Sequence, residues 1–322
     1  MTAIAHFNVL EQLSETTTGE LWRARDTKVG RTVALKLVSA DMFRDAGSRQ
    51  AFFEAARAAM GLSHPNIATL FDAGEYEGDC YLAYEFASGI TLRQENDGRS
   101  VNPRRAVELA VQIADALADA HGSGIIHGDL RPDTVIVTHK GSAKVLEMGM
   151  SRWTSGGRVR AEAATDPKSL GPDAIRVVSY MSPEQVLGGQ IDARSDVFSL
   201  GVLLYEMLTG RNPFAAATPA DTVVNVIAAK IGPTHALSTS LGDLDALVMR
   251  TMAKEIDQRP QSAASLSAEL RGIGAMLDVR AGDMAPSELL PLDDDGVTNR
   301  GRWWAAAAAV LAIGGLAWWL FR

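Results

Sequence analysis

The spacing of hydrophobic positions divides the chain into two regions. In the first, short apolar runs such as 32–38 and 80–86 stand between glycine and acidic turn residues, a pattern typical of β-strands. One helical stretch, about 48–62, interrupts these strands and ends at His64 and Pro65. The first region is therefore predicted to be a small, strand-rich unit.

From about residue 100 onward, apolar residues recur at helical spacing. In 103–121, valine, alanine and leucine residues return every three or four positions. The run 196–209 is largely apolar, which predicts a buried helix. Further helices are expected near 219–230, 243–253 and 262–277. The whole pattern predicts an α+β chain with a small β-rich lobe followed by a larger helical lobe.

The C-terminal part of the chain has a different pattern. Residues 278–302 contain two prolines and the acidic run 293–295, with few large apolar side chains, and are expected to form a linker. The 19 residues of 303–321 carry no charge. As a helix they would span close to 30 Å, about the thickness of a bilayer core. Tryptophan pairs bracket the run, as aromatic residues do at membrane interfaces. One C-terminal transmembrane helix is predicted, with a buried or interfacial helix as the alternative.

Composition and charge narrow the classes of function. The 322 residues are 47% hydrophobic and 22% charged, values that exclude a mainly disordered chain. The net charge of −8 argues against nucleic-acid binding, which needs a basic face. The single cysteine, Cys80, excludes an internal disulfide framework and a multi-cysteine zinc site. Arg300 and Arg302 precede the apolar run and only Arg322 follows it. This asymmetry favours a single-pass protein of the cytoplasmic (inner) membrane, with its N-terminal region in the cytoplasm.

Six short motifs occur in a fixed order. They are Val-Ala-Leu-Lys at 33–36, His-Gly-Asp-Leu-Arg-Pro-Asp-Thr at 127–134, Glu-Met-Gly at 147–149, Ser-Pro-Glu at 182–184, Asp-Val-Phe-Ser-Leu-Gly at 196–201 and Arg-Pro at 259–260. In order and spacing they resemble the motifs of protein kinases, specifically of bacterial serine/threonine kinases. The resemblance covers about 5–275. It implies a two-lobed kinase fold over 1–277, with an N-lobe at about 1–86 and a C-lobe at about 87–277.

The resemblance implies an ATP site between the lobes, used with Mg or Mn. Lys36 would contact the ATP phosphates, and Glu54 on the following helix would hold this lysine in place. Asp129 would orient the substrate hydroxyl and accept its proton. Arg131 stands where the family has a catalytic-loop lysine, so it keeps the charge but not the size.

The same resemblance implies where the adenine lies. Ala34 and Ile136 would form its two walls, and the backbone of the hinge, including Glu85 and Ala87, would bond to it. Three more residues are implied to be structural: Glu184 and Arg259 as a buried ion pair at the end of the activation segment, and Asp196 as a brace for the catalytic loop.

The sequence departs from the family pattern where phosphates and metal would bind. In the run from Ser14 to Gly19, only the final glycine of the glycine-rich turn remains, and an ordinary hairpin turn is an equally good interpretation. Glu147 replaces the metal-binding aspartate and Thr134 replaces the asparagine that is the second metal ligand. Gly128 replaces an arginine that normally pairs with a phosphorylated activation loop. The middle of the activation segment, 154–168, is expected to be a loop.

These departures favour a membrane-tethered, kinase-like signalling protein that is a pseudokinase or a very weak kinase and acts by binding a protein partner. The alternative is an active serine/threonine kinase with unusual metal ligands and a protein substrate, because Lys36, Glu54 and Asp129 are retained. Homo-oligomerisation, the input signal and the identity of the partner are left open by the sequence.

Overall fold

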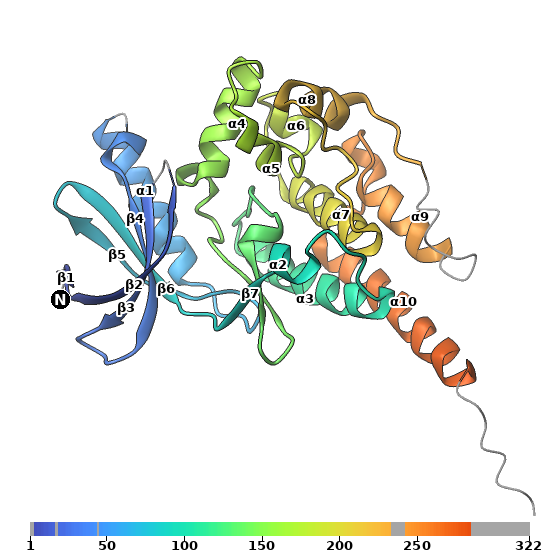
Figure 1. Cartoon of the computed structure of the whole chain (residues 1–322), viewed down its shortest axis with the longest axis horizontal. Coiled ribbons are helices and arrows are strands. Elements are labelled where there is room, and N and C mark those ends of the chain that lie inside the picture. The colour runs from blue at the N-terminus through green and yellow to red at the C-terminus, as the bar shows by residue number, and fades with distance from the viewer. Residues whose placement is uncertain (1–2, 17–18, 44, 233–241, 285–322) are drawn as a thin grey trace, which may run out of the picture. The chain divides into compact units, whose positions relative to one another are not determined.

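A computed structural model describes residues 3–16, 19–43, 45–232 and 242–284 (Figure 1). The chain divides into two compact units, Met1–Val279 and Arg280–Arg322. Among the described residues, no helix has both the length and the apolar character needed to cross a membrane. The expected membrane span at 303–321, and all of the expected linker after residue 284, lie outside the described residues.

The N-lobe is a six-stranded sheet with one long helix. The strands are ordered β1-β2-β3-β4-β6-β5, and each strand is antiparallel to its neighbours. Their bounds are β1 Ala3–Ile4, β2 Phe7–Thr16, β3 Gly19–Asp26, β4 Thr32–Val38, β5 Leu70–Tyr76 and β6 Asp79–Glu85. Helix α1 spans Ala46–Met60, preceded by a 3-10 turn η1 at Ala40–Met42. The strands and the helix expected here from the sequence are confirmed.

The side-chain alternation of β6 explains why this sheet is covered on two faces. Tyr81 and Ala83 belong to one buried cluster, with Phe7 from β2. Cys80, Leu82 and Tyr84 belong to the other, in which Phe52 of α1 is buried. Met150 and Trp153, far along the chain, join this second cluster. The core of the N-lobe therefore includes residues that follow the Glu-Met-Gly motif.

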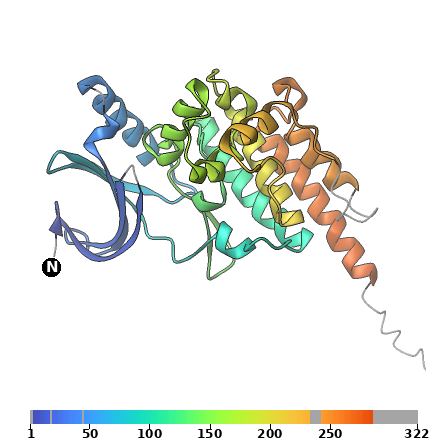
Figure 2. The same cartoon turned by 45° about the horizontal axis from the view of Figure 1, so that its top comes forward.

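The C-lobe is built around two long helices, α3 (Pro103–Gly122) and α7 (Ala193–Thr209) (Figures 1 and 2). Helix α7 has buried residues on nearly every side, as its apolar sequence predicts. The other helices are α2 Leu92–Asn96, α4 Ser155–Thr165, α5 Ile175–Val178, α6 Pro183–Val186, α8 Pro219–Ala228, α9 Gly242–Thr251 and α10 Ala263–Met284.

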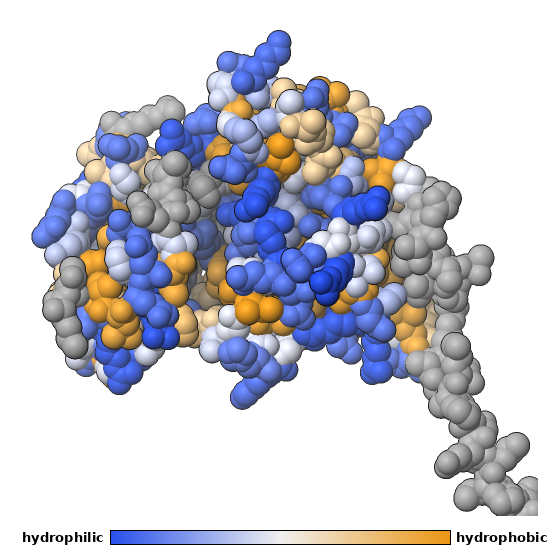
Figure 3. Space-filling view, in the orientation of Figure 1, coloured by the Kyte–Doolittle hydropathy of each residue, from blue (hydrophilic) through white to orange (hydrophobic). Residues whose placement is uncertain are grey.

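A small three-stranded sheet of order β7-β8-β9 lies near the catalytic motifs. It is formed by Gly89–Thr91, Val135–Thr138 and Ala143–Val145. On the face in Figure 3, hydrophilic residues cover most of the surface of the first unit, and hydrophobic residues gather in separate patches. The two-lobed α+β fold expected from the sequence is therefore confirmed for the described part of the chain.

The close packing of α7 against α9 at Gly201 can be tested by substitution. A Cβ on Gly201 would stand 2.1 Å from Oγ1 of Thr251 and 2.8 Å from its Cβ. We expect Gly201→Ala to lower the free energy of unfolding by about 1–3 kcal/mol, because the two helices must separate. Urea unfolding would measure this change.

Gly272→Ala on α10 is the matched control, because a Cβ there meets nothing within 4 Å. It should leave stability unchanged or raise it slightly, as expected for alanine in a helix. Equal effects of the two substitutions would contradict the packing argument.

Candidate active site

A cavity of about 780 Å³ separates the β2–β3 hairpin and β4 from the catalytic loop and the activation segment. This volume lies within the usual range of small-molecule sites. Of the residues expected at an ATP site, it is lined by Gly19, Lys36, Ala87, Arg131, Thr134, Ile136 and Glu147. Ala34, Glu54, Glu85 and Asp129 are not among its lining residues.

Lys36 forms an ion pair with Glu147 in this cavity. Lys36 is held on β4, and Glu147 follows β9 in the first position of the Glu-Met-Gly motif. The side chains are only 11% and 20% exposed, so water screens the pair weakly. The two residues assigned to phosphate and metal binding therefore neutralise each other.

The expected contact between Glu54 and Lys36 is not formed in the structure. Glu54 is exposed and accepts a hydrogen bond of 2.8 Å from Gln50 on its own helix. The reason is the helical phase, since the buried face of α1 is defined by Phe52, Ala56 and Ala59. At 3.6 residues per turn, Glu54 lies about 200° from Phe52 and therefore on the opposite face.

Glu147 is held in a constrained state. Its φ of +57° is in the left-handed region, which is uncommon for residues other than glycine. Burial, the largest single effect, would raise the pKa of Glu147, but the charge and hydrogen bond of Lys36 together with the charges of Arg131 and His127 outweigh it. The pKa is lowered overall, so Glu147 is a carboxylate at neutral pH.

Thr134 is the second residue expected to bind metal. In the structure its hydroxyl is engaged in hydrogen bonds with backbone groups of the catalytic loop. Its hydroxyl accepts from the N–H of Arg131 at 3.1 Å and lies 3.2 Å and 3.0 Å from the carbonyls of Asp129 and Arg131. Its role here is to brace the catalytic loop. Within the described ranges, no group of three or more His, Cys, Asp or Glu side chains is arranged to hold a metal ion. The donors at the expected metal position do not fit such an ion in this conformation.

The carboxylate of Asp129 is covered by the chain itself. Arg131 Nε donates to Oδ1 at 3.1 Å, and the Thr154 hydroxyl lies 3.0 Å from Oδ2. A Cβ on Gly156 would stand 2.1 Å from this carboxylate, so the backbone at Gly156 lies directly against it. Asp129 is only 8% exposed. A substrate hydroxyl cannot approach the carboxylate until this contact opens.

The prediction that 154–168 is a loop is wrong, because the segment contains helix α4. Thr154 caps the helix by accepting from the N–H of Gly157, and Ala163 is buried in the C-lobe core. Gly156 and Gly157 have low helix propensity, which hid the helix. A threonine cap followed by the alanine-rich run 161–164 was the signal that could have revealed it. Thr154 and Gly156 were therefore missed as residues of the site.

The frame around the catalytic loop has the expected contacts. Asp196 accepts from the N–H groups of His127 and Gly128, both at 2.8 Å, and lies 2.8 Å from Nε2 of His121. His127 is fully buried, with Nε2 2.9 Å from the carbonyl of Leu146 and Nδ1 accepting from the Asp129 N–H. The loop is thus held by buried hydrogen bonds.

The remaining residues expected at the ATP site have structural partners. Ser14 pairs with Leu21 across the β2–β3 hairpin, and a Cβ on Gly19 would stand 1.8 Å from the Leu37 carbonyl, so glycine is required there. Ala34 pairs with Tyr84 across β4 and β6. Glu85 forms a 2.7 Å ion pair with Lys144, a partner that the sequence did not reveal.

Comparison with known proteins shows to which family this chain belongs. The model of the protein kinase domain matches residues 7–269 of this chain. The chain belongs to the bacterial serine/threonine protein kinase family. It is 36% identical over 260 residues to the serine/threonine-protein kinase PknB of Mycobacterium tuberculosis, a match that covers 78% of this chain and 40% of PknB. It is 31% identical over 298 residues to the serine/threonine-protein kinase pkn2 of Myxococcus xanthus, covering 91% of this chain and 35% of pkn2.

This kinase-family chain therefore spans well under half the length of these two relatives. Among solved structures, the kinase domain of Mycobacterium tuberculosis PknI is similar with a TM-score of 0.65. The match has 21% identity and covers 84% of this chain and 97% of the PknI kinase-domain chain. At this identity the likeness shows the fold alone.

The end of the activation segment is anchored by Glu184 and Arg259, as the resemblance implied. Arg259 donates to both carboxylate oxygens at 2.8 Å and 2.9 Å, and its side chain is 0% exposed. Burial would raise the pKa of Glu184, but hydrogen bonds from Arg259 and Ser195 outweigh it and lower the pKa to about 2. The ordinary value is 4.5, so the stabilisation is complete above pH 4.5 and is lost as pH falls toward 2.

We therefore expect a pH-dependent difference in the free energy of unfolding between the native protein and Glu184→Gln. It should be largest near pH 6 and shrink by about 1–2 kcal/mol on going to pH 3, after allowance for the partial exposure of the pair. Urea titrations at both pH values would measure it. A difference that stays constant would contradict the lowered pKa of Glu184.

The close approach of Gly156 to Asp129 gives a second prediction. Gly156→Ala should push the start of α4 away from the carboxylate, because the new Cβ has no room. We expect the amide protons of 155–165 to exchange about tenfold faster, as for a segment that opens more often. Gly171→Ala, where a Cβ meets nothing within 4 Å, is the control. Unchanged exchange in the first variant would show that α4 does not depend on this contact.

Proposed function

We propose that this chain is a membrane-tethered, kinase-like signalling protein that acts mainly by binding a protein partner and transfers little or no phosphate. The observation that carries the proposal is the ion pair between Lys36 and Glu147. In the family, these two positions hold the ATP phosphates and a metal ion. Here each is the electrostatic partner of the other.

The chemistry of phosphoryl transfer explains why this matters. Catalysis of this reaction is almost entirely positioning and neutralisation of charge. Glutamate at position 147 moves the carboxylate out by one methylene, and the Thr134 hydroxyl bonds to the catalytic loop. Displacement of one reacting group by about 1 Å costs on the order of 10²-fold in rate. Two altered ligands together bring transfer close to background.

The tether rests on the sequence of 303–321, which is uncharged and flanked by tryptophan pairs. Arg300 and Arg302 on one side favour a cytoplasmic kinase-like domain. In this arrangement, the domain presents its surface to partners at the inner face of the membrane.

An active serine/threonine kinase is the second candidate. It is favoured by the retained Lys36 and Asp129, and by the formed contacts of Asp196 and of Glu184 with Arg259. The relatives PknB and pkn2 are serine/threonine-protein kinases. This candidate requires that α4 leave Asp129 and that ATP separate Lys36 from Glu147.

The deciding experiment is transfer of labelled phosphate from ATP with Mg or Mn by the full chain, combined with a thermal shift on adding ATP. We expect transfer near background for the native protein. The double substitution Glu147→Asp and Thr134→Asn should raise the rate by on the order of 10²-fold, because it restores the donor set that Mg prefers.

Asp129→Asn added to this double variant should remove the regained transfer, which identifies Asp129 as the residue that acts on the hydroxyl. Gly272→Ala, a substitution far from the site, is the control and should leave the rate of transfer unchanged. Native transfer that is abolished by Asp129→Asn alone would refute the pseudokinase proposal in favour of the active kinase.

A further inference from the structure

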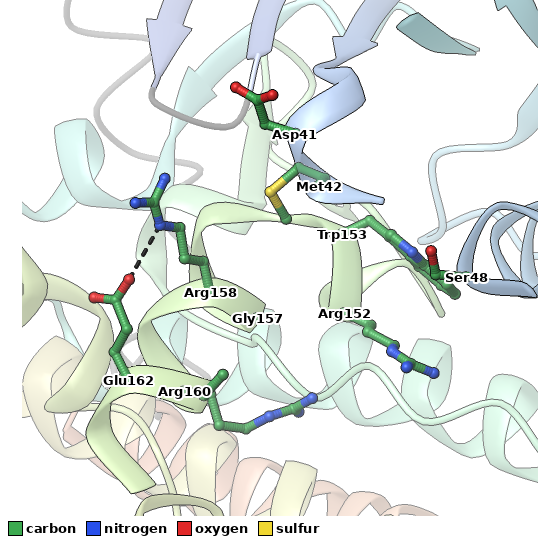
Figure 4. A pocket seen from close by; sticks show the side chains of 10 residues that line it. Asp41, Met42, Ser48, Arg152, Trp153, Gly157, Arg158, Arg160 and Glu162 are labelled. Atoms are coloured by element: carbon green, nitrogen blue, oxygen red, sulfur yellow. Dashed lines mark hydrogen bonds and ion pairs between the residues drawn. The ribbon is translucent and has the colours of Figure 1, made fainter. Parts of the chain in front are cut away.

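A second cavity, of about 630 Å³, lies between the start of the N-lobe helix and the activation segment. One side is formed by Asp41, Met42 and Ser48, around η1 and the first turn of α1. The other side is formed by 152–162, which includes α4. Arg152, Arg158 and Arg160 are among the side chains that line this space (Figure 4). We call it the arginine pocket.

The charges of the arginine pocket do not balance. Arg158 is paired with Glu162, one turn further along α4, at 3.1 Å. The other lining carboxylate is Asp41. Arg152 lies beside the ring of Trp153, 5.7 Å from its centroid, which is a cation–π contact and not an ion pair. Among the lining residues, the guanidinium groups of Arg152 and Arg160 thus face one further carboxylate, while Asp129 acts on Arg160 from outside the pocket.

Arg160 gives an independent indication of an absent partner. Its Nη1 is buried and has no hydrogen-bond partner in the part of the chain that the structure describes. Buried polar groups in native structures nearly always have a partner, and an unsatisfied one calls for an explanation. Burial lowers the pKa of Arg160, Asp129 opposes this change, and the like charge of Arg152 adds to it. An anion between these two arginines would offset the repulsion between their charges.

Gly128 makes room for this arrangement. A Cβ on Gly128 would stand 3.5 Å from Nη1 of Arg160 and 2.8 Å from the Ser151 hydroxyl. The φ of +71° at Gly128 also favours glycine. The position where the catalytic loop lacks an arginine is therefore next to an arginine that α4 supplies.

We propose that the arginine pocket binds the phosphate group of a small molecule. Planar guanidinium groups bind phosphate through paired hydrogen bonds, and this geometry suits a dianion better than a single carboxylate. The volume is within the range of small-molecule sites and exceeds what one phosphate ion needs. Met42 and Trp153 offer an apolar wall for the rest of the ligand.

Binding at the arginine pocket would act on Asp129 through α4. The helix that carries Arg158 and Arg160 begins at the residues that cover the Asp129 carboxylate. A ligand that joins α4 to Arg152 and to the start of α1 stabilises the covered conformation. By linkage, any event that uncovers Asp129 must weaken binding of this ligand by the same factor.

Calorimetric titration of the full chain with inorganic phosphate and with glycerol 3-phosphate, at constant ionic strength, tests the proposal. We expect both to bind, and Arg152→Gln and Arg160→Gln each to weaken binding about tenfold, the effect of losing one charge-assisted hydrogen bond. Tighter binding of glycerol 3-phosphate would identify a phosphate monoester as the ligand, and equal binding would identify free phosphate. Amide exchange of 155–165 should slow with ligand in the native protein only.

The controls separate this site from other sources of binding. Arg57→Gln changes an exposed arginine of α1 that does not line the pocket, and should bind as the native protein does. Lys36→Met should also keep binding, which distinguishes the pocket from the large cavity between the lobes. Because Arg152 is exposed, its variant is expected to fold even where Arg160→Gln does not. No binding by the native protein, or unchanged binding in Arg152→Gln, would overturn the site, and ligand-independent exchange of 155–165 would overturn its coupling to Asp129.

Discussion

The ion pair between Lys36 and Glu147 governs the rest of the site. Two opposite charges with little exposure attract strongly, and separating them without replacement would leave an unpaired charge in a poorly solvated place. A ligand that separates the pair must therefore supply charges that satisfy both. A metal-bound triphosphate does so in principle, since its metal ion pairs with the carboxylate and its phosphates pair with the lysine. A nucleoside without phosphates leaves the pair intact, so only phosphate-bearing ligands have to offset the cost of separating Lys36 from Glu147.

The covered Asp129 and the pair at Lys36 are separate barriers. The first is steric, since the backbone at Gly156 lies against the carboxylate. The second is electrostatic and lies in the large cavity between the lobes. Arg131 links the two, because it donates to Asp129 and its charge also acts on Glu147. In the proposed function, the kinase fold keeps a surface for partners while these two features hold back the chemistry.

Hydrophobic periodicity predicted strands β4 and β6 and the longer helices, because buried faces impose a repeat that the sequence must obey, although α10 extends seven residues beyond its expected end. Ordered motifs predicted the family and the contacts of Asp196 and of Glu184 with Arg259. The partner of Lys36 could not be predicted, because a sequence shows which charges exist but not which ones meet. The predicted contact of Glu54 with Lys36 was wrong because a shift of one or two positions along a helix turns a side chain from the core to solvent. Helix α4 was missed because tertiary packing of Ala163 and the cap at Thr154 outweigh its two glycines.

The packing of Trp153 against Phe52, with ring centroids 5.5 Å apart, sets a thermodynamic limit on partners. Trp153 belongs to the activation segment, yet it is buried in the core of the N-lobe. Pulling the segment away would expose this side chain, at a cost of about 1.5–3 kcal/mol for a large apolar residue. A partner that needs the segment released would bind about 10- to 100-fold more weakly than one of equal contact quality that accepts it in place. If the protein acts by binding partners, as proposed, the burial of Trp153 favours those that recognise the activation segment in its closed position.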